Sequence, residues 1–514
     1  MKQKSRTEYS VLNIMTGLGG YAINTVLGFI CRMVFVKCLS EDYLGVNGFF
    51  TNILTMLSLA ELGIGNAVVF ALYKPLAEDD KDKIASLVKL YGTAYKTIGI
   101  IVGAIGIALM PFLNVIIRNE PNIAESIYLL YIINLFNTAS TYFFSYRSSL
   151  IIAAQENYII SGVNYAVTIG QSIIQMFLLV FTRNYLLYLL VQTVGTFTYN
   201  ITVSKIAVIK FPYIKDKNIK PLPEDEKKTL FNNVRDLTIY KISSLLVNST
   251  DNILITFFKG LATTGIASNY TLLVTTLNTL LSQIFNGLTA SIGNHNAIEK
   301  DDSKYAMFSF LNMMNFWIFG WATLGIIFCS SDIVKLCFGA NYVLPIEIPF
   351  IMAANFFSVG MMNAVWTYKH TMGLFHYGRF LQFATGVLNI IFSIFFGKIW
   401  GLFGILGATL CARLATSLWY DPYAVFKYGF NKSPLLYVRK YLQYLVVMII
   451  AAIGCKLSFR VLIGSLAIKV IEEIILCSVV TNVCFWVALH RQPEFIKLKE
   501  ILSRILSIVR IKKS

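Results

Sequence analysis

Charged residues are scarce in this 514-residue chain. Asp, Glu, Lys and Arg make up only 14% of it, whereas a soluble domain has about 25%. Apolar residues reach 56%, and a surface with so few charges would aggregate in water. The composition therefore excludes a soluble enzyme, and its high hydrophobicity excludes a disordered chain.

Motifs of soluble catalysts and metal proteins are missing as well. The eight cysteines form no C-x-x-C pair and mostly lie in apolar runs, so we expect free thiols and neither a metal site nor a disulfide framework. No G-x-x-x-x-G-K-[ST] motif occurs, which excludes ATP hydrolysis by a P-loop. The net charge of +17 is not gathered in one stripe, so a nucleic-acid-binding protein is also excluded.

Long apolar runs are what the chain does contain. Its apolar residues suffice for roughly fourteen spans of about 20 residues each. We therefore predict an all-α polytopic membrane protein with about 14 transmembrane helices. The expected spans are 11–36, 44–72, 94–117, 126–146, 158–182, 185–209, 237–258, 266–291, 305–329, 346–368, 380–399, 401–421, 441–462 and 470–490.

The distribution of Lys and Arg predicts the orientation. With the N-terminus inside, 30 of the 44 basic residues fall on the cytoplasmic side, nine fall outside and five lie within spans. A bias of this size follows the positive-inside rule. Because the number of spans is even, we expect both termini in the cytoplasm.

The polar stretch 210–236 separates six spans from eight and predicts the domain organisation. We expect an N-terminal lobe at 1–209, a cytoplasmic linker at 210–236 and a C-terminal lobe at 237–421. Residues 422–514 would then hold two extra helices and a basic tail. A shift of 222 residues overlays the first two spans on the seventh and eighth, which favours two pseudo-symmetric lobes related by a parallel repeat.

Two carboxylates inside predicted spans are candidates for coupling or gating, because ionisable groups are costly in a bilayer. Glu61 lies near mid-membrane beside Gly63 and Gly65, which weaken or bend the helix. Asp251 lies in a polar run that begins at Asn248 and suits a wet cavity. The alternative for each carboxylate is a pairing with a neighbouring group that serves packing alone.

Three cations inside spans are candidates for binding substrate: Arg32, Lys241 and Arg413. Guanidinium and ammonium groups suit a phosphate or pyrophosphate. Snorkelling to the inner surface is the alternative for Lys241. Span amides that include Asn24, Gln171 and Gln175 suit sugar hydroxyls, and the alternative for each amide is hydrogen bonding between helices.

Three stretches resemble a known transporter family. Residues 59–65, which continue to 73–77, resemble the second span and following loop of bacterial polysaccharide flippases. Residues 146–148 with 155–157 resemble the connection between the fourth and fifth spans, and residues 248–252 resemble the start of the second lobe. The family is the Wzx-type branch of the multidrug/oligosaccharidyl-lipid/polysaccharide (MOP) exporter superfamily, which exports O-antigen, capsule or teichoic-acid precursors.

The resemblance implies an alternating-access transporter rather than an enzyme, with two lobes in a V around a cationic cavity. Its substrate would be an undecaprenyl-pyrophosphate-linked oligosaccharide, a precursor of lipopolysaccharide or another cell-envelope glycan. Arg32, Lys241 and Arg413 would bind the pyrophosphate, while Glu61 and Asp251 would couple or gate transport. The lipid bilayer and polysaccharide-assembly enzymes are the expected partners of a monomer in the bacterial plasma (inner) membrane.

Other functions remain open at this point. A drug exporter of the same fold would need an aromatic and acidic cavity. A membrane glycan polymerase or ligase would need a large outer loop, and the longest here, about 330–345, carries only Asp332 and Lys335 as charges. No cofactor is expected; proton or sodium coupling, the membrane potential, or removal of product by later enzymes could supply energy.

The 222-residue repeat places Arg32 and Asp251 at similar depth on related helices, which predicts that they face one another. Arg32→Asp or Asp251→Arg alone should then abolish transport, because each leaves two like charges in a low dielectric. The reciprocal double variant should restore part of the transport rate, measured in proteoliposomes. A double variant no better than the singles would exclude the pairing.

Overall fold

The computed structural model describes residues 6–57, 64–117, 121–154, 156–216, 221–224, 250–298, 300–374, 377–378, 380–459 and 465–499. These residues form helices joined by short connections, with no strand among them. Within the same ranges, nine helical segments are long and apolar enough to cross a membrane. The predicted all-α polytopic membrane protein is confirmed, while the total of fourteen spans and the V-shaped pair of lobes stay predictions.

The chain divides into two compact units, Met1–Gly265 and Ile266–Ser514. The predicted lobe boundary lies around 210–236, partly outside the described residues, and stays a prediction. Helices of the first unit are α1 (Arg6–Cys38), α2 (Glu41–Leu57), α3 (Ile64–Ala77), α4 (Lys81–Leu109), α5 (Leu113–Ile116), α6 (Ile127–Ser145), α7 (Ser148–Ala153), α8 (Asn157–Thr182) and α9 (Tyr185–Lys210), with short 3-10 turns at Met110–Phe112 and Pro212–Lys215.

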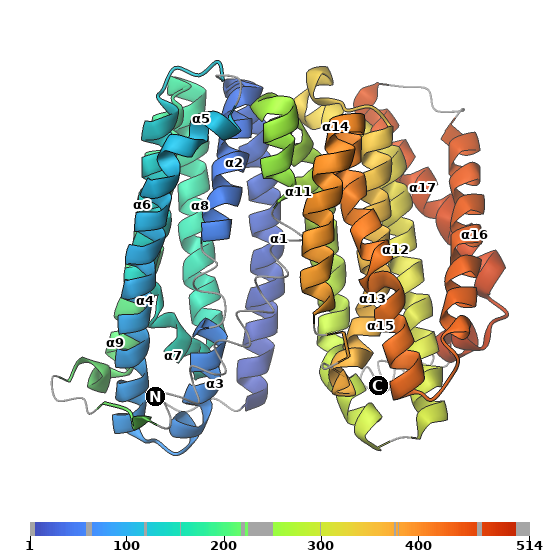
Figure 1. Cartoon of the computed structure of the whole chain (residues 1–514), viewed down its shortest axis with the longest axis horizontal. Helices are drawn as coiled ribbons and strands as arrows, with labels where there is room; N and C mark the ends of the chain where they lie inside the picture. Colours follow the sequence, from blue (N-terminus) through green and yellow to red (C-terminus); the bar gives the residue numbers. More distant parts are fainter. Residues whose placement is uncertain are drawn as a thin grey trace, which may run out of the picture. The chain divides into compact units, whose positions relative to one another are not determined.

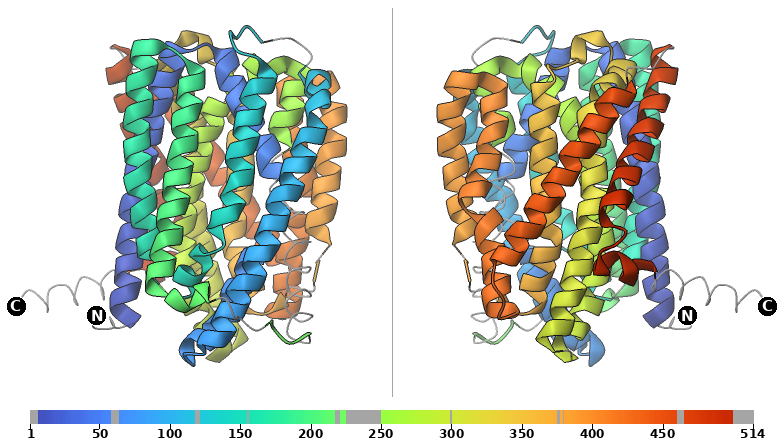
Figure 2. Two further views of the ribbon diagram at one scale, coloured as in Figure 1. Left: turned by 90° about the vertical axis from the view of Figure 1, so that its left-hand side faces the viewer. Right: turned by 90° about the vertical axis from the view of Figure 1, so that its right-hand side faces the viewer.

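In the first unit, α4, α6, α9 and α8 stand side by side as long columns, seen in the left view of Figure 2. Glycines at seven-residue intervals on α4 allow α6 to pack closely. A Cβ atom on Gly92 would lie 2.9 Å from the Tyr146 ring, and one on Gly106 would lie 2.3 Å from Leu135. Small residues at helix interfaces are typical of membrane proteins, where close packing replaces the hydrophobic effect as the driving force.

The helix α8 has polar side chains inside the unit and apolar side chains on the outside. Its buried residues include Ser172 and Gln175, whereas Phe177 and Phe181 are 61% and 71% exposed. This pattern is the reverse of a soluble helix, and it places the apolar face against lipid.

Long helices also build the second unit, where α12 packs against α13, α16 and α17 (Figure 1 and the right view of Figure 2). Stacked and edge-to-face rings fill its core, including Phe316 against Tyr444 with ring centroids 4.4 Å apart.

The elements of the second unit are α11 (Asp251–Ile298), which begins in the first unit, α12 (Asp301–Phe338), α13 (Glu347–Thr371), α14 (Leu381–Ala415), α15 (Ser417–Ala424), α16 (Leu435–Ser458) and α17 (Leu466–Leu489), with short turns at Ala340–Tyr342 and Val425–Gly429.

A single glycine turns α14 into two antiparallel arms (Figure 1). Gly401 has φ 59° and ψ −131°, a left-handed conformation that favours glycine. Across the arms, the Thr385 and Thr416 hydroxyls lie 2.7 Å apart, and Asn389 Nδ2 donates to Thr409 Oγ1 at 2.8 Å. Gly260 likewise breaks the helical geometry of α11, with φ 84°. The predicted spans 380–399 and 401–421 therefore correspond mainly to the two arms, with α15 at the end of the second.

Several helices extend beyond the apolar windows of the sequence. The helix α4 begins at Lys81 rather than near residue 94, and α12 covers Asp301–Phe338 rather than 305–329. Hydropathy detects only the part of a helix that matches the hydrocarbon core, and polar turns at either end continue the helix outside it. The predicted span 44–72 corresponds to α2 and α3, and residues 58–63 between them lie outside the described residues.

The α14 hairpin predicts a strong position dependence for adding one methyl group. Gly404→Ala would place Cβ 2.1 Å from the Phe396 carbonyl oxygen, whereas Gly407→Ala meets Ile351 at an ordinary 3.9 Å. Gly404→Ala should therefore cost about 1–3 kcal/mol, and Gly407→Ala should cost less than about 0.5 kcal/mol. Thermal unfolding in detergent measures both; equal midpoints for the two variants would contradict the close packing of the arms.

Candidate functional site

Arg32 lies on α1 where this helix packs against α8 and approaches the start of α9. Its side chain is partly buried, and its charge interacts with the Tyr188 phenol of α9. The neighbouring Cys31 thiol is hydrogen-bonded to the same phenol. Tyr188 therefore joins two consecutive side chains of α1 to α9.

The two predicted amides of α8 lie next to this group. Gln175 is 2% exposed, and its Nε2 donates to the Tyr188 carbonyl oxygen at 3.1 Å. Gln171 Nε2 donates to Gln175 Oε1 at 3.4 Å, and Gln171 packs against Gly195. The structure thus brings Arg32, Gln171 and Gln175 together around Tyr188. Gln175 hydrogen-bonds between helices, as the alternative expects, while Gln171 bonds within α8. The role of both amides in sugar binding stays a prediction.

Aromatic rings line the end of α1 beyond Arg32. Phe35 packs edge-on against Tyr185 and Tyr188, with ring centroids 5.7 and 5.2 Å apart. Tyr185 in turn contacts Tyr43, whose hydroxyl donates to Glu125 Oε2 at 2.5 Å. Phe35 and Tyr185 are buried, so their rings pack between helices, whereas Tyr188 is partly exposed beside the guanidinium. An aromatic ring next to a guanidinium suits sugar faces and anionic groups.

The other predicted residues of the first unit occupy other helices or another turn of α1. Asn24 lies eight residues before Arg32, about 12 Å along α1, and its buried Oδ1 has no hydrogen-bond partner in the described ranges. Asp251 is the first residue of α11, where a carboxylate stabilises the helix N-terminus. Gly65 is the second residue of α3. Four predicted residues lie outside the described residues: Glu61, Gly63, Lys241 and Asn248.

Arg413 belongs to the second unit and is partly buried. It occupies the last turn of α14, three residues before the backbone departs from helical geometry at Thr416. A cation there interacts favourably with the carbonyl end of the helix. Arg413 lies within the candidate membrane segment Leu381–Gly429, and its role in substrate binding stays a prediction.

The sequence analysis missed a buried ion pair in the same unit. Lys369 Nζ of α13 lies 2.6 Å from Asp421 Oδ1 of α15, and the two side chains are 14% and 4% exposed. Trp366 Nε1 donates to the other carboxylate oxygen at 3.0 Å. The signal for Asp421 was its position between aromatic residues just before Pro422 inside a predicted span. Lys369 gave no signal, because it lies at a span end where basic residues are common.

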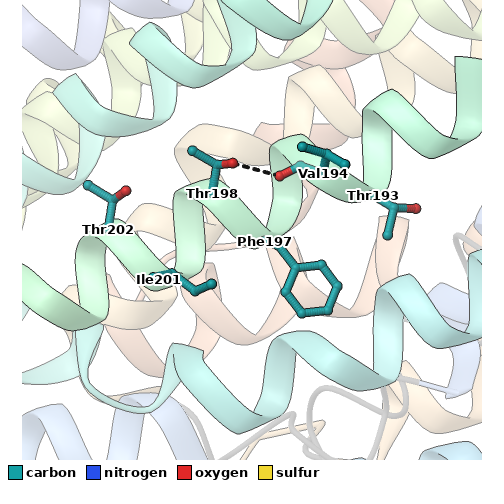
Figure 3. Close-up of a pocket in the computed structure, with 6 residues that line it drawn as sticks. All are labelled: Thr193, Val194, Phe197, Thr198, Ile201 and Thr202. Carbon is teal, nitrogen blue, oxygen red and sulfur yellow. Dashed lines mark hydrogen bonds between the residues drawn. The ribbon is translucent and has the colours of Figure 1, made fainter.

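A hollow of about 370 Å³ lies along α9 (Figure 3). Six residues line it, all from this helix: Thr193, Val194, Phe197, Thr198, Ile201 and Thr202. Thr193 and Thr198 donate their hydroxyls to carbonyl oxygens one turn earlier, so their hydrogens are already used. With no charged lining residue, this hollow suits an apolar group better than a pyrophosphate.

Comparison with known proteins finds similarity of fold at low sequence identity. No family model matches the chain, and no curated protein matches it by sequence. Among solved structures, the lipid II flippase MurJ in its inward closed conformation has a TM-score of 0.61 and 15% identity, over 92% of this chain and 98% of that one. An inward-facing multidrug resistance MATE family transporter of the MOP superfamily has a TM-score of 0.55 and 13% identity, over 78% of this chain and 94% of that one. The chain therefore has the fold of these membrane transporters.

The ion pair in the second unit predicts an asymmetric response to substitution. Asp421→Asn leaves Lys369 as a buried ammonium with a weakened partner, which should cost about 3 kcal/mol or more of unfolding free energy. The double variant Lys369→Met with Asp421→Leu removes both charges and should recover most of that loss. Denaturant unfolding in detergent measures both, and a double variant less stable than Asp421→Asn would contradict the argument.

Proposed function

We propose that this chain is a flippase that moves an undecaprenyl-pyrophosphate-linked oligosaccharide from the cytoplasmic to the outer leaflet by alternating access. The observation that carries the proposal is the polar group around Arg32, Gln171, Gln175 and Tyr188, within a fold shared over 92% of the chain with a lipid II flippase. The nine apolar helical segments of the described residues support a multi-pass transporter.

The chemistry of the Arg32 group fits the proposed head group. A guanidinium presents five donors in a planar fork that matches phosphate oxygens. The Gln175 amide donates to the backbone carbonyl of Tyr188 and accepts from Gln171, so the residue that carries the phenol is anchored beside the guanidinium. The ring of Tyr188, which is only partly buried, offers a flat surface for a sugar, and the buried rings of Phe35 and Tyr185 support it from behind. In this proposal the head group binds here while the lipid tail stays in the bilayer.

The predicted residues outside this group keep their proposed roles. Lys241 and Arg413 would contact the pyrophosphate at other stages of transport, with Asn24 and Asn248 as neutral contacts. Glu61 and Asp251 would respond to the coupling step, and Gly63 and Gly65 would allow the helix to bend. The proposed location is the bacterial plasma membrane with both termini in the cytoplasm, and polysaccharide-assembly enzymes would receive the product.

A multidrug exporter is the second candidate, because a MATE family transporter shares the fold at a TM-score of 0.55. A cation at the centre of the polar group favours an anionic substrate over the cationic compounds that an acidic cavity would take. A glycan polymerase or ligase is less well supported, since the connection after α12 is short and α13 begins at Glu347.

Flipping assays in proteoliposomes test the function. Wild-type protein should move a short lipid-pyrophosphate oligosaccharide across the bilayer. Arg32→Ala should slow this movement about tenfold or more, because a charge-assisted contact to phosphate contributes about 1.5–3 kcal/mol. Arg32→Lys should fall between the two, since it keeps the charge without the fork.

Lys37→Ala is the matched control, because Lys37 carries the same charge in the last turn of α1 but is exposed. It should flip substrate at the wild-type rate. An equal loss of flipping rate in both variants would mean that positive charge anywhere on α1, rather than the Arg32 group, controls the rate. Failure of the wild type with several glycans, together with efflux of cationic dyes, would overturn the flippase in favour of the drug exporter.

A further inference from the structure

Three charged side chains join α12 to the start of α17 in the second unit. Lys469 Nζ lies 2.9 Å from Asp332 Oδ2 and 3.5 Å from Glu473 Oε1. Glu473 is the most deeply buried of the three, with a side chain only 4% exposed, whereas that of Lys469 is 40% exposed. Asp332 and Glu473 lie six and seven residues from their nearest helix ends, about 10 Å along each axis.

The charges of this cluster do not balance when both acids are ionised. Two carboxylates then share one ammonium, and the longer contact belongs to the more deeply buried carboxylate. Glu473 Oε2 is buried and has no hydrogen-bond donor among the described residues. The Asp332 carboxyl group lies within hydrogen-bonding reach of Glu473, but two ionised carboxylates accept and cannot donate. Burial of a carboxylate in this state is costly.

We propose that Asp332 and Glu473 share one exchangeable proton and that the cluster is a proton-binding site. The proton resides on the Glu473 carboxyl group and is donated in a hydrogen bond to the Asp332 carboxylate. Asp332 keeps its ion pair with Lys469, so the three side chains carry no net charge. The O–H bond on Glu473 forms as one O–H bond of a hydronium ion breaks on the exposed side of Lys469, which leaves a water molecule.

The other charged groups near the cluster leave this balance in place. Lys335 follows on α12 and acts on Asp332, but it is exposed and hydrated. On α16, which packs against α17, the charged group at this end is Lys456, which is also exposed. Glu472 precedes Glu473 on α17 and is partly exposed. The thiols of Cys329, Cys455 and Cys477 lie further along the three helices.

In the predicted orientation the cluster lies on the outer side of the membrane, because the end of α12 and the start of α17 both lie there. Protons would therefore exchange with the outside. Loss of the proton leaves a net negative charge between α12 and α17 and weakens their contact. If the chain is the proposed flippase, external pH then changes the rate of transport; this consequence alone rests on the proposed function.

Infrared difference spectroscopy of the full-length protein in liposomes tests the site directly. A protonated carboxyl group has a carbonyl stretching band that a carboxylate lacks. Raising the pH from about 5 to about 9, above the range where ordinary carboxyl groups titrate, should remove one such band per chain in the wild type. Glu473→Gln, which mimics the protonated acid and should fold, must lack this band.

Two further variants separate the proton site from a plain ion-pair cluster. Glu472→Gln is the matched control and should retain the band. Asp332→Asn removes the like charge and adds an amide donor, so Glu473 should ionise against Lys469 and the band should disappear by pH 5. Absence of the band in the wild type, or its full retention in Glu473→Gln, would overturn the proposal.

A flipping assay with the same variants tests the consequence for transport, and its outcome is independent of the infrared result. Wild-type flipping should respond to the pH outside the proteoliposome, and Glu473→Gln should lose that response while Glu472→Gln keeps it. Absence of flipping in every variant would count against the flippase and leave the infrared result to decide the site. Retained pH response in Glu473→Gln would exclude this proton from transport.

Discussion

A polar group inside a bilayer must find its partner within the protein, since lipid offers none. This constraint organises both units. Threonines on α9 and α14 donate to carbonyl oxygens of their own helices, and Asn389 donates across the hairpin to Thr409. Asp421 accepts from both Lys369 and Trp366. Because these needs are met inside, the outer faces can be almost wholly apolar, as Phe177 and Phe181 show.

The same constraint decides which helices are tied together. Apolar packing against lipid or against another helix differs little in free energy, so close approach and buried charges provide the specificity. Glycines bring α6 against α4. The pair Lys369 and Asp421 fixes α13 to α15, and Lys469 fixes α17 to α12. Each ion pair thereby ties two helices of the second unit together.

Hydropathy predicts spans such as those of α8, α9, α13 and α17 well, because a bilayer demands about 20 apolar residues in one run. It predicted Arg32 as an intramembrane cation for the same reason. Hydropathy could not identify Tyr188 as the neighbour of Arg32, since this contact depends on how α1 and α9 pack. Lys369 and Asp421 are 52 residues apart and Asp332 and Lys469 are 137 apart; a pairing at such separations is visible only once the helices are assembled. In the predicted orientation Lys469 lies on the outer side, and its ion pair with Asp332 offsets its charge there.

For the proposed flippase, the energetics of export indicate what a proton bound between α12 and α17 would do. A pyrophosphate head with about two negative charges gains about 5 kcal/mol when it leaves a cell with an inside-negative potential of about 100 mV. That energy corresponds to a bias of about a thousandfold, so the membrane potential alone suffices to drive export. A proton site at the outer end is then not needed as the source of energy. Because its charge state sets the strength of one helix contact, it would act on the rate at which the second unit rearranges, which separates the driving force from the control of transport.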